Sequence, residues 1–177
     1  MDTARWARSV IGGPSPALGR AGALCPYVPA AISRDTLTVV ESTDTARPVM
    51  IDTLLDEAGW LAEQLGRTPA GERIWVAHLL VFTRIGANPD VLTEIRTDLR
   101  GRLLRQGITI GEFYRDSRDT SIRNPRHSVG RAPWPCFALR AYMPQDGKIL
   151  RIRPDSAIGY LPPGAADARR TARSGQV

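Results

Sequence analysis

Residues 115–135 carry the side chains best suited to bind an anion. The segment has no helix or strand pattern, and such long loops in a small domain are usually functional or disordered. Its charged residues are Arg115, Arg118, Arg123, Arg126 and Arg131, with Asp116 and Asp119. Guanidinium groups bind carboxylates and phosphates through paired hydrogen bonds. We therefore expect Arg123 and Arg131, with Arg140 on the next strand, to bind a small anionic or amino-acid-derived ligand. Arginines that are solvated or paired with helix carboxylates are the alternative.

Two further side chains near this segment could take part in catalysis. His127 could act as a general base or as a metal ligand, and the alternative is a solvated surface histidine. Tyr114 could donate a proton. Glu112 is a possible ligand-binding carboxylate, which we expect to point inwards and pair with Arg140 across neighbouring strands. By contrast, His78 lies in an apolar run and is expected to be a neutral core histidine.

Cys25-Pro26-Tyr27 is a second candidate site. A thiolate followed by a proline, whose ring stiffens the turn, is one way in which proteins hold haem iron. Haem is therefore a candidate cofactor, with Cys25 or His127 as the ligand of its iron. A buried structural thiol is the competing interpretation. Cys136 is the other cysteine of the chain, so neither a disulfide framework nor a zinc site of paired cysteines is expected.

The net charge of +6 comes from the two ends of the chain. Residues 1–34 and 151–177 each contribute +3, whereas residues 35–150 carry equal numbers of basic and acidic side chains. The basic ends lack interleaved aromatic residues, which argues against specific nucleic-acid binding. No apolar stretch approaches the roughly 20 residues that cross a bilayer, and no signal-peptide pattern is visible. We expect a cytoplasmic protein without a membrane partner. Glycine-rich phosphate loops, HExxH and GxSxG motifs are also absent from the sequence.

The periodicity of apolar residues predicts the elements that position these side chains. Strands are expected at 36–42, 73–83, 108–114 and 136–143, and helices at 49–66 and 89–105. The strand at 73–83 is apolar on both faces and should be central. The last strand should place Cys136, Ala138 and Arg140 on one face, opposite Phe137 and Leu139.

These elements predict a single α+β domain. Its sheet should be mostly antiparallel, with four or slightly more strands, and packed by two helices in the order β-α-β-α-β-β. The domain should span 25–161, between a flexible arm at 1–24 and a disordered basic tail at 162–177.

Taken in order, several motifs resemble a family of small actinobacterial proteins of unknown function that often occur among natural-product genes. The matching residues are Gly22, Cys25-Pro26-Tyr27-Val28-Pro29, Leu80-Val81-Phe82, Gly107, Gly111-Glu112-Phe113, Asn124-Pro125, Arg131-Ala132-Pro133-Trp134-Pro135, Ala138-Leu139-Arg140, Asp146 and Leu150. They span roughly residues 20–152, which is nearly all of the expected domain. The resemblance implies a role in specialised metabolism.

The sequence departs from the pattern of that family at two positions. Relatives carry a histidine after Gly-Glu-Phe, where this chain has Tyr114, and another after the Ala-Leu-Arg run, where it has Ala141. If those histidines bind a metal or haem in the relatives, this chain has lost the site or uses Tyr114 instead. The sequence also resembles, more faintly, haem-dependent N-hydroxylases that oxidise guanidino nitrogens. The likeness lies in the Cys-Pro element and in the order of glycine, strand and loop. No catalytic residue is transferred from it.

Two functions follow from these observations, and they leave open whether the protein is an enzyme. The first is an enzyme of specialised metabolism, with haem as an optional cofactor. Its pocket would lie between the Cys25 segment and residues 112–140, under the arginine-bearing loop. The second is a non-catalytic accessory or protein-binding module, in which Trp134 and Tyr142 would lie on an exposed apolar patch.

Overall fold

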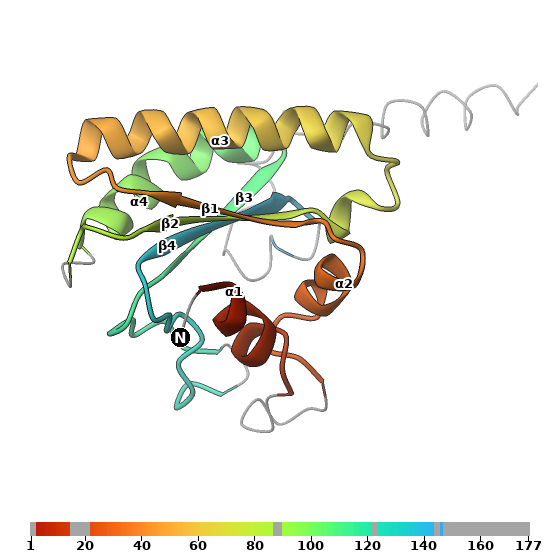
Figure 1. Cartoon of the computed structure of the whole chain (residues 1–177), viewed down its shortest axis with the longest axis horizontal. Helices are drawn as coiled ribbons and strands as arrows, with labels where there is room; N and C mark the ends of the chain where they lie inside the picture. The colour runs from red at the N-terminus through yellow and green to blue at the C-terminus, as the bar shows by residue number, and fades with distance from the viewer. Residues whose placement is uncertain (1–2, 15–21, 87–89, 122–123, 144–145, 147–177) are drawn as a thin grey trace, which may run out of the picture.

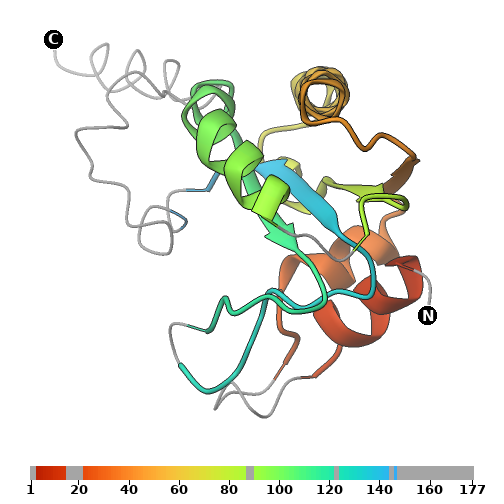
Figure 2. The same cartoon turned by 90° about the vertical axis from the view of Figure 1, so that its left-hand side faces the viewer.

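The computed structural model describes residues 3–14, 22–86, 90–121, 124–143 and 146. They form a sheet between two layers of helices (Figures 1 and 2). The strands are β1 (Leu37–Ser42), β2 (Ala77–Phe82), β3 (Ile108–Phe113) and β4 (Cys136–Ala141). One face is covered by α3 (Arg47–Arg67) and α4 (Asp90–Arg105), and the other by α1 (Thr3–Trp6), a π-helical turn (Ala7–Ile11) and α2 (Tyr27–Ser33). The predicted single α+β domain with a four-stranded sheet is confirmed.

The strand order β1-β2-β4-β3 confirms that β2 is a central strand. β1 and β2 pair in parallel, as strands joined by a helical crossover do. β4 pairs antiparallel with both β2 and β3, so the sheet is mixed. β4 separates β2 and β3 although it comes last in the sequence among the strands of the described residues. The first turn of the predicted 73–83 strand is instead a 3-10 turn at Arg73–Trp75.

The face under α3 and α4 is packed with large apolar side chains. The two helices bury Met50, Leu54, Ala58, Leu61, Leu65, Leu92, Ile95, Leu99 and Leu103 at the three- and four-residue steps of a helix. They pack on Leu80, Phe82, Phe137 and Leu139 of the sheet. The rings of Phe82 and Phe137 meet edge to face with centroids 5.9 Å apart. His78 lies on this face with only 1% of its surface exposed, so its predicted burial is confirmed.

The second face is partly covered by residues of the segment 1–24, for which a flexible arm was predicted. Residues 3–14 are instead helical for most of their length and bury Trp6, Ala7 and Ile11. The Trp6 indole Nε1 donates a hydrogen bond of 3.1 Å to the Arg131 carbonyl oxygen. The expectation failed because this layer is held by contacts with distant segments, such as the bond from Trp6 to Arg131, which no local pattern indicates. Residues 15–21 and the tail at 162–177 lie outside the described residues.

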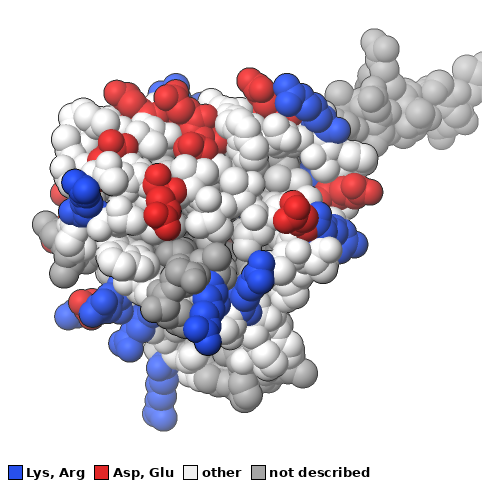
Figure 3. All heavy atoms as spheres, viewed as in Figure 1, with Lys and Arg blue, Asp and Glu red and all other residues white. Residues whose placement is uncertain are grey.

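The visible surface divides by charge. Figure 3 shows acidic side chains gathered mainly along the upper part of the molecule, over α3, and basic side chains prevailing below. The arginines of the 115–135 loop that the structure describes, Arg115, Arg118, Arg126 and Arg131, are all exposed. Among the described residues, no helix combines the length and apolar character needed to span a membrane.

Candidate functional site

Small side chains on the second face of the sheet leave space beneath the N-terminal helices. Two rows cross β2, β4 and β3 in register: Leu79, Ala138 and Gly111, then Ala77, Arg140 and Thr109. Side chains of a strand alternate between faces, so these rows lie on one face. Because Ala138, Gly111 and Ala77 are small, the helices above do not fill the gap. The result is a pocket of about 290 Å³.

The walls of this pocket are mainly apolar. They comprise Trp6, Ala7 and Ile11 from the N-terminal helices, Cys25, Tyr27 and Val28 around the start of α2, Leu37 of β1 and Phe113 of β3. The rings of Trp6 and Phe113 meet at 5.5 Å between centroids. A volume of about 290 Å³ is near the lower end of the roughly 300–1,000 Å³ typical of small-molecule pockets.

Arg140 forms the polar end of the pocket and is held by Asp146. Its Nη1 donates to Asp146 Oδ2 at 2.8 Å and to the Ala141 carbonyl oxygen at 2.9 Å, and its Nη2 donates to Asp146 Oδ1 at 2.6 Å. The Tyr27 ring lies 5.1 Å from the guanidinium carbon, within range of a cation–π contact. Burial disfavours the charge, but the hydrogen bonds and charge of Asp146 outweigh it and raise the pKa of Arg140. The guanidinium is therefore a fixed cation.

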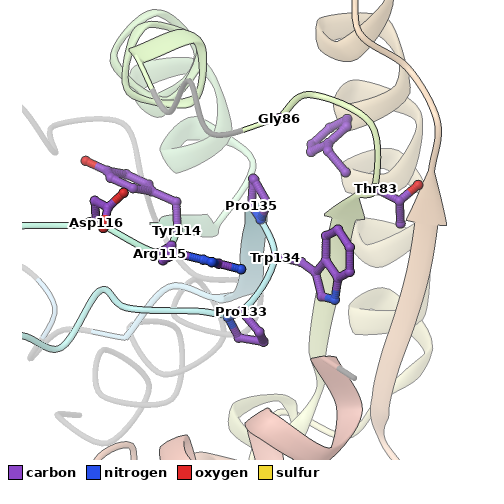
Figure 4. Close-up of a pocket in the computed structure, with 9 residues that line it drawn as sticks. Thr83, Gly86, Tyr114, Arg115, Asp116, Pro133, Trp134 and Pro135 are labelled. Atoms are coloured by element: carbon purple, nitrogen blue, oxygen red, sulfur yellow. The ribbon is translucent and has the colours of Figure 1, made fainter. Parts of the chain in front are cut away.

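A second hollow, of about 270 Å³, lies at the end of the sheet where β2 and β3 stop and β4 begins. It is lined by Phe82, Thr83, Gly86, Tyr114, Arg115, Asp116, Pro133, Trp134 and Pro135. In Figure 4, Trp134 lies beside Thr83 on one side, Tyr114 and Asp116 lie on the other, and Arg115 extends between them. Trp134 is 44% exposed. The hollow is thus an open surface feature with an aromatic rim.

The sequence-predicted site residues separate into several places. Cys25 and Arg140 line the pocket under the N-terminal helices. Tyr114 lines the second hollow instead. His127 is half-buried in the loop, where its main chain bonds to Asn124 and Ser121, and it lines neither hollow. Only two of these four side chains therefore share a cavity.

The remaining candidates that the structure describes do not line the pocket either. The Arg131 side chain is exposed, and the contribution of this residue is its carbonyl oxygen, which accepts the Trp6 indole bond. Arg123 lies outside the described residues. None of the described residues of the 115–135 loop lines the pocket. The wall that we expected from the loop is supplied by the N-terminal helices.

The expected pair between Glu112 and Arg140 is wrong. Glu112 lies opposite Phe137 in the sheet and points towards α4, whereas Arg140 lies opposite Thr109 and points to the other face. Thr93 Oγ1 donates to Glu112 Oε1 at 3.1 Å, and Arg96 Nε lies 3.3 Å from Oε2. Burial raises the pKa of Glu112, although Arg96 and Thr93 act in the opposite direction. Glu112 therefore ties β3 to α4.

The pocket does not fit haem. Its volume of about 290 Å³ is too small for a ring of four pyrroles and its substituents. Haem also carries two propionates, and Arg140, the cation that lines the pocket, is already paired with Asp146. The alternative ligand Tyr114 lies in the other hollow. Among the described residues, no group of three or more His, Cys, Asp or Glu side chains could hold a metal ion.

Sequence reasoning missed two features of the pocket. Asp146 was visible only as the end of a motif, although its carboxylate is buried against Arg140. The small residues Ala77, Gly111 and Ala138 were also overlooked. The sequence does contain a pattern that could have indicated the pocket, because each of these small residues occupies the same face of a different strand. The pattern can be recognised only when the register of the strands is known.

Comparison with known proteins identifies the family of the chain. Neither the curated proteins nor the solved structures include a match to it. The model of one family, described as a domain of unknown function (DUF6875), matches residues 1–174. The match includes the N-terminal helices, the whole sheet, Arg140 and Asp146. The chain therefore belongs to the DUF6875 family.

Proposed function

We propose that this protein binds a small, mainly apolar molecule in the pocket between its N-terminal helices and its sheet. The observation that carries the proposal is the floor of small residues under a space of about 290 Å³. Protein interiors are normally packed as densely as organic crystals, and an unfilled cavity lowers stability in proportion to its volume. Apolar cavities of roughly 150 Å³ already bind molecules of the size of benzene.

The arrangement of polar groups favours binding over catalysis. Arg140 and Asp146 line the pocket, but they bond to each other and so are not arranged as a separate acid and base. His127 and Tyr114, the predicted catalytic side chains, lie elsewhere. The proposal thus combines the small-molecule pocket of the first predicted function with the non-catalytic role of the second. A role in specialised metabolism stays a prediction, because it rests on the sequence resemblance alone.

The patch predicted for a protein partner has less support. Trp134 precedes β4 and Tyr142 follows it, so the whole length of the strand lies between them. Trp134 is exposed beside the second hollow, whereas Tyr142 is half-buried. The two side chains do not form one surface.

The test is to fill the pocket from its floor. Ala138→Leu adds apolar atoms between Leu79 and Gly111, whereas Gly59→Leu adds a leucine side chain on α3, where no heavy atom lies within 4 Å of the position that its Cβ would take. Binding of ethylbenzene is measured by NMR titration. We expect the wild-type protein and Gly59→Leu to bind it and Ala138→Leu to bind at least tenfold more weakly, since the added side chain occupies the site.

Cys25 gives an independent readout of occupancy. It lines the pocket, whereas Cys136 is fully buried and burial raises the pKa of its thiol to about 12. Alkylation of the native protein, followed by mass spectrometry, should therefore modify Cys25 first. Ethylbenzene should slow that reaction in the wild type and not in Ala138→Leu. Equal ethylbenzene affinity in all three proteins would refute the proposed site.

A further inference from the structure

We infer that the end of the ligand that meets Arg140 carries a hydrogen-bond acceptor and no net charge. A ketone, ester, amide or lactone fits this description, and a carboxylate or phosphate does not. The inference rests on the proposed function, because it names the chemical class of the molecule bound in the same pocket. It also differs from the anionic ligand expected from the sequence.

The first step is the count of donors on Arg140. A guanidinium has five N–H groups. Three of them bond to Asp146 and to the Ala141 carbonyl oxygen. Asp146 takes the end of the guanidinium formed by Nη1 and Nη2, so the Nε–H and the second N–H of Nη2 remain on the adjacent edge. Within the described part of the chain, neither of these two groups bonds to an acceptor. A ligand oxygen could accept from both.

The second step is access to that edge. Arg140 lines the pocket and keeps 21% of its side-chain surface exposed. The Tyr27 ring covers one face of the guanidinium at 5.1 Å. Asp146, with 2% of its side chain exposed, also accepts the Met143 backbone N–H at 2.8 Å, which fixes its position. A ligand therefore meets a rigid edge with two donors.

The third step is the balance of charge. Asp146 already neutralises Arg140, and among the described residues that line the pocket no other side chain carries a charge at neutral pH, since burial lowers the pKa of His78 to about 4. A carboxylate placed here would leave one net negative charge in an apolar pocket, which is costly. A neutral acceptor satisfies both N–H groups without adding charge. The rest of the ligand contacts Trp6, Leu79 and Phe113, so it should be apolar.

Three probes of similar size separate these possibilities. Ethylbenzene has no acceptor, acetophenone has a neutral carbonyl, and benzoate has a carboxylate. In the wild-type protein we expect acetophenone to bind about tenfold more tightly than ethylbenzene, because it gains hydrogen bonds to a charged donor. Benzoate should bind more weakly than either. Affinities are measured by NMR titration at neutral pH and low salt.

Two variants test the role of charge. Asp146→Asn keeps an oxygen for the Met143 N–H but leaves Arg140 unbalanced, so benzoate should become the tightest of the three probes. The double variant Arg140→Met with Asp146→Leu removes both charges, and such replacements of buried pairs are often tolerated. In this variant the ratio of acetophenone affinity to ethylbenzene affinity should fall from about ten to about one, because the donors that favour the carbonyl are gone. This variant also decides the question if Asp146→Asn does not fold.

The outcomes distinguish this inference from the proposed function. Equal affinities for ethylbenzene and acetophenone in the wild type would mean that the Arg140 edge is unused. Benzoate as the tightest wild-type ligand would mean that the charge argument is wrong. Either result overturns the inference and leaves binding in the pocket intact. If none of the three probes binds, the proposed function itself fails.

Discussion

The two faces of the sheet are built from the same strands but differ in how densely their side chains pack. Under α3 and α4, side chains such as Leu80, Phe82 and Phe137 are completely buried in one continuous cluster. Under the N-terminal helices, Ala138 and Gly111 leave a pocket of about 290 Å³. Adjacent residues of one strand thus serve two purposes. The long helices cover a densely packed face, and the short ones leave the pocket open.

The largest expected effect is the loss of stability when either of two neighbouring leucines of β2 is replaced by alanine. Leu80 packs in the cluster under α3 and α4, and Leu79 borders the pocket. Leu80→Ala should lower the free energy of unfolding by about 4 kcal/mol and Leu79→Ala by about 2 kcal/mol, because a side chain beside existing space loses fewer contacts. Urea denaturation measures both values. Equal losses would mean that the two faces are packed alike.

The next effect is the loss of stability at acidic pH that His78, on the face under α3, should cause. His78 Nε2 lies 3.0 Å from Glu57 Oε2, and its ring contacts Trp60. Glu57 favours the protonated imidazole, but burial dominates and lowers the pKa of His78 from 6.5 to about 4. Burial also raises the pKa of Glu57, which weakens its opposing effect.

The folded protein therefore binds a proton at His78 less readily than the unfolded chain does. Its stability should fall as the pH drops from 6.5 towards 4, by up to about 3 kcal/mol at 1.36 kcal/mol per pKa unit. His78→Phe should remove this part of the pH dependence and leave the profile above pH 7 parallel to that of the wild type. Urea denaturation at a series of pH values is the measurement. Parallel wild-type and variant profiles from pH 4 to 6.5 would contradict the assignment.

A smaller effect tests the attachment of the N-terminal layer. Trp6→Phe keeps an aromatic ring against Phe113 and loses the bond from the indole to Arg131. The free energy of unfolding should fall by about 1 kcal/mol, the usual net contribution of a hydrogen bond. Trp134→Phe is the control, because this indole is 44% exposed, and it should change stability by less than about 0.5 kcal/mol. A flexible N-terminal arm would instead make both substitutions neutral.

The smallest expected effect is the change in stability when a glycine is replaced by alanine, which should differ between α3 and the floor of the pocket. Gly59→Ala on the open surface of α3 should stabilise the protein by slightly less than about 1 kcal/mol, because alanine favours a helix. Gly111→Ala in the floor of the pocket should not stabilise it, since the new Cβ would lie 3.3 Å from the Phe113 ring. Thermal melting compares the two variants. A gain from both would show that the pocket floor tolerates extra atoms.

Much of the fold could be predicted, because its main elements follow their own periodicity. The alternation of β4 correctly separated Cys136 and Arg140 from Phe137 and Leu139. The partner of Arg140 was not predicted, because Asp146 lies beyond the end of β4, where no strand or helix pattern indicates its position. Glu112 was expected to pair with Arg140, but the residue opposite Arg140 is Thr109. Glu112 is three positions further along β3, and this odd number places its side chain on the opposite face.

The N-terminal layer was missed for a different reason. Its bond from Trp6 to Arg131 joins residues 125 positions apart, and no local pattern encodes such a contact. The insertion of β4 between two earlier strands also depends on pairing between segments that are separated in the sequence, which no local pattern indicates. The pocket therefore arises from contacts between distant segments, whereas the cluster under α3 and α4 arises mainly from regular periodic patterns.

The bond from Trp6 to Arg131 also orders the events of folding. During synthesis the N-terminal helices emerge first, but their partner is made 125 residues later. Closing such a large loop is entropically costly until other contacts have brought its ends together. We therefore expect the helices that cover the pocket to dock after the sheet has formed, and a truncated chain that stops before β4 to lack the pocket.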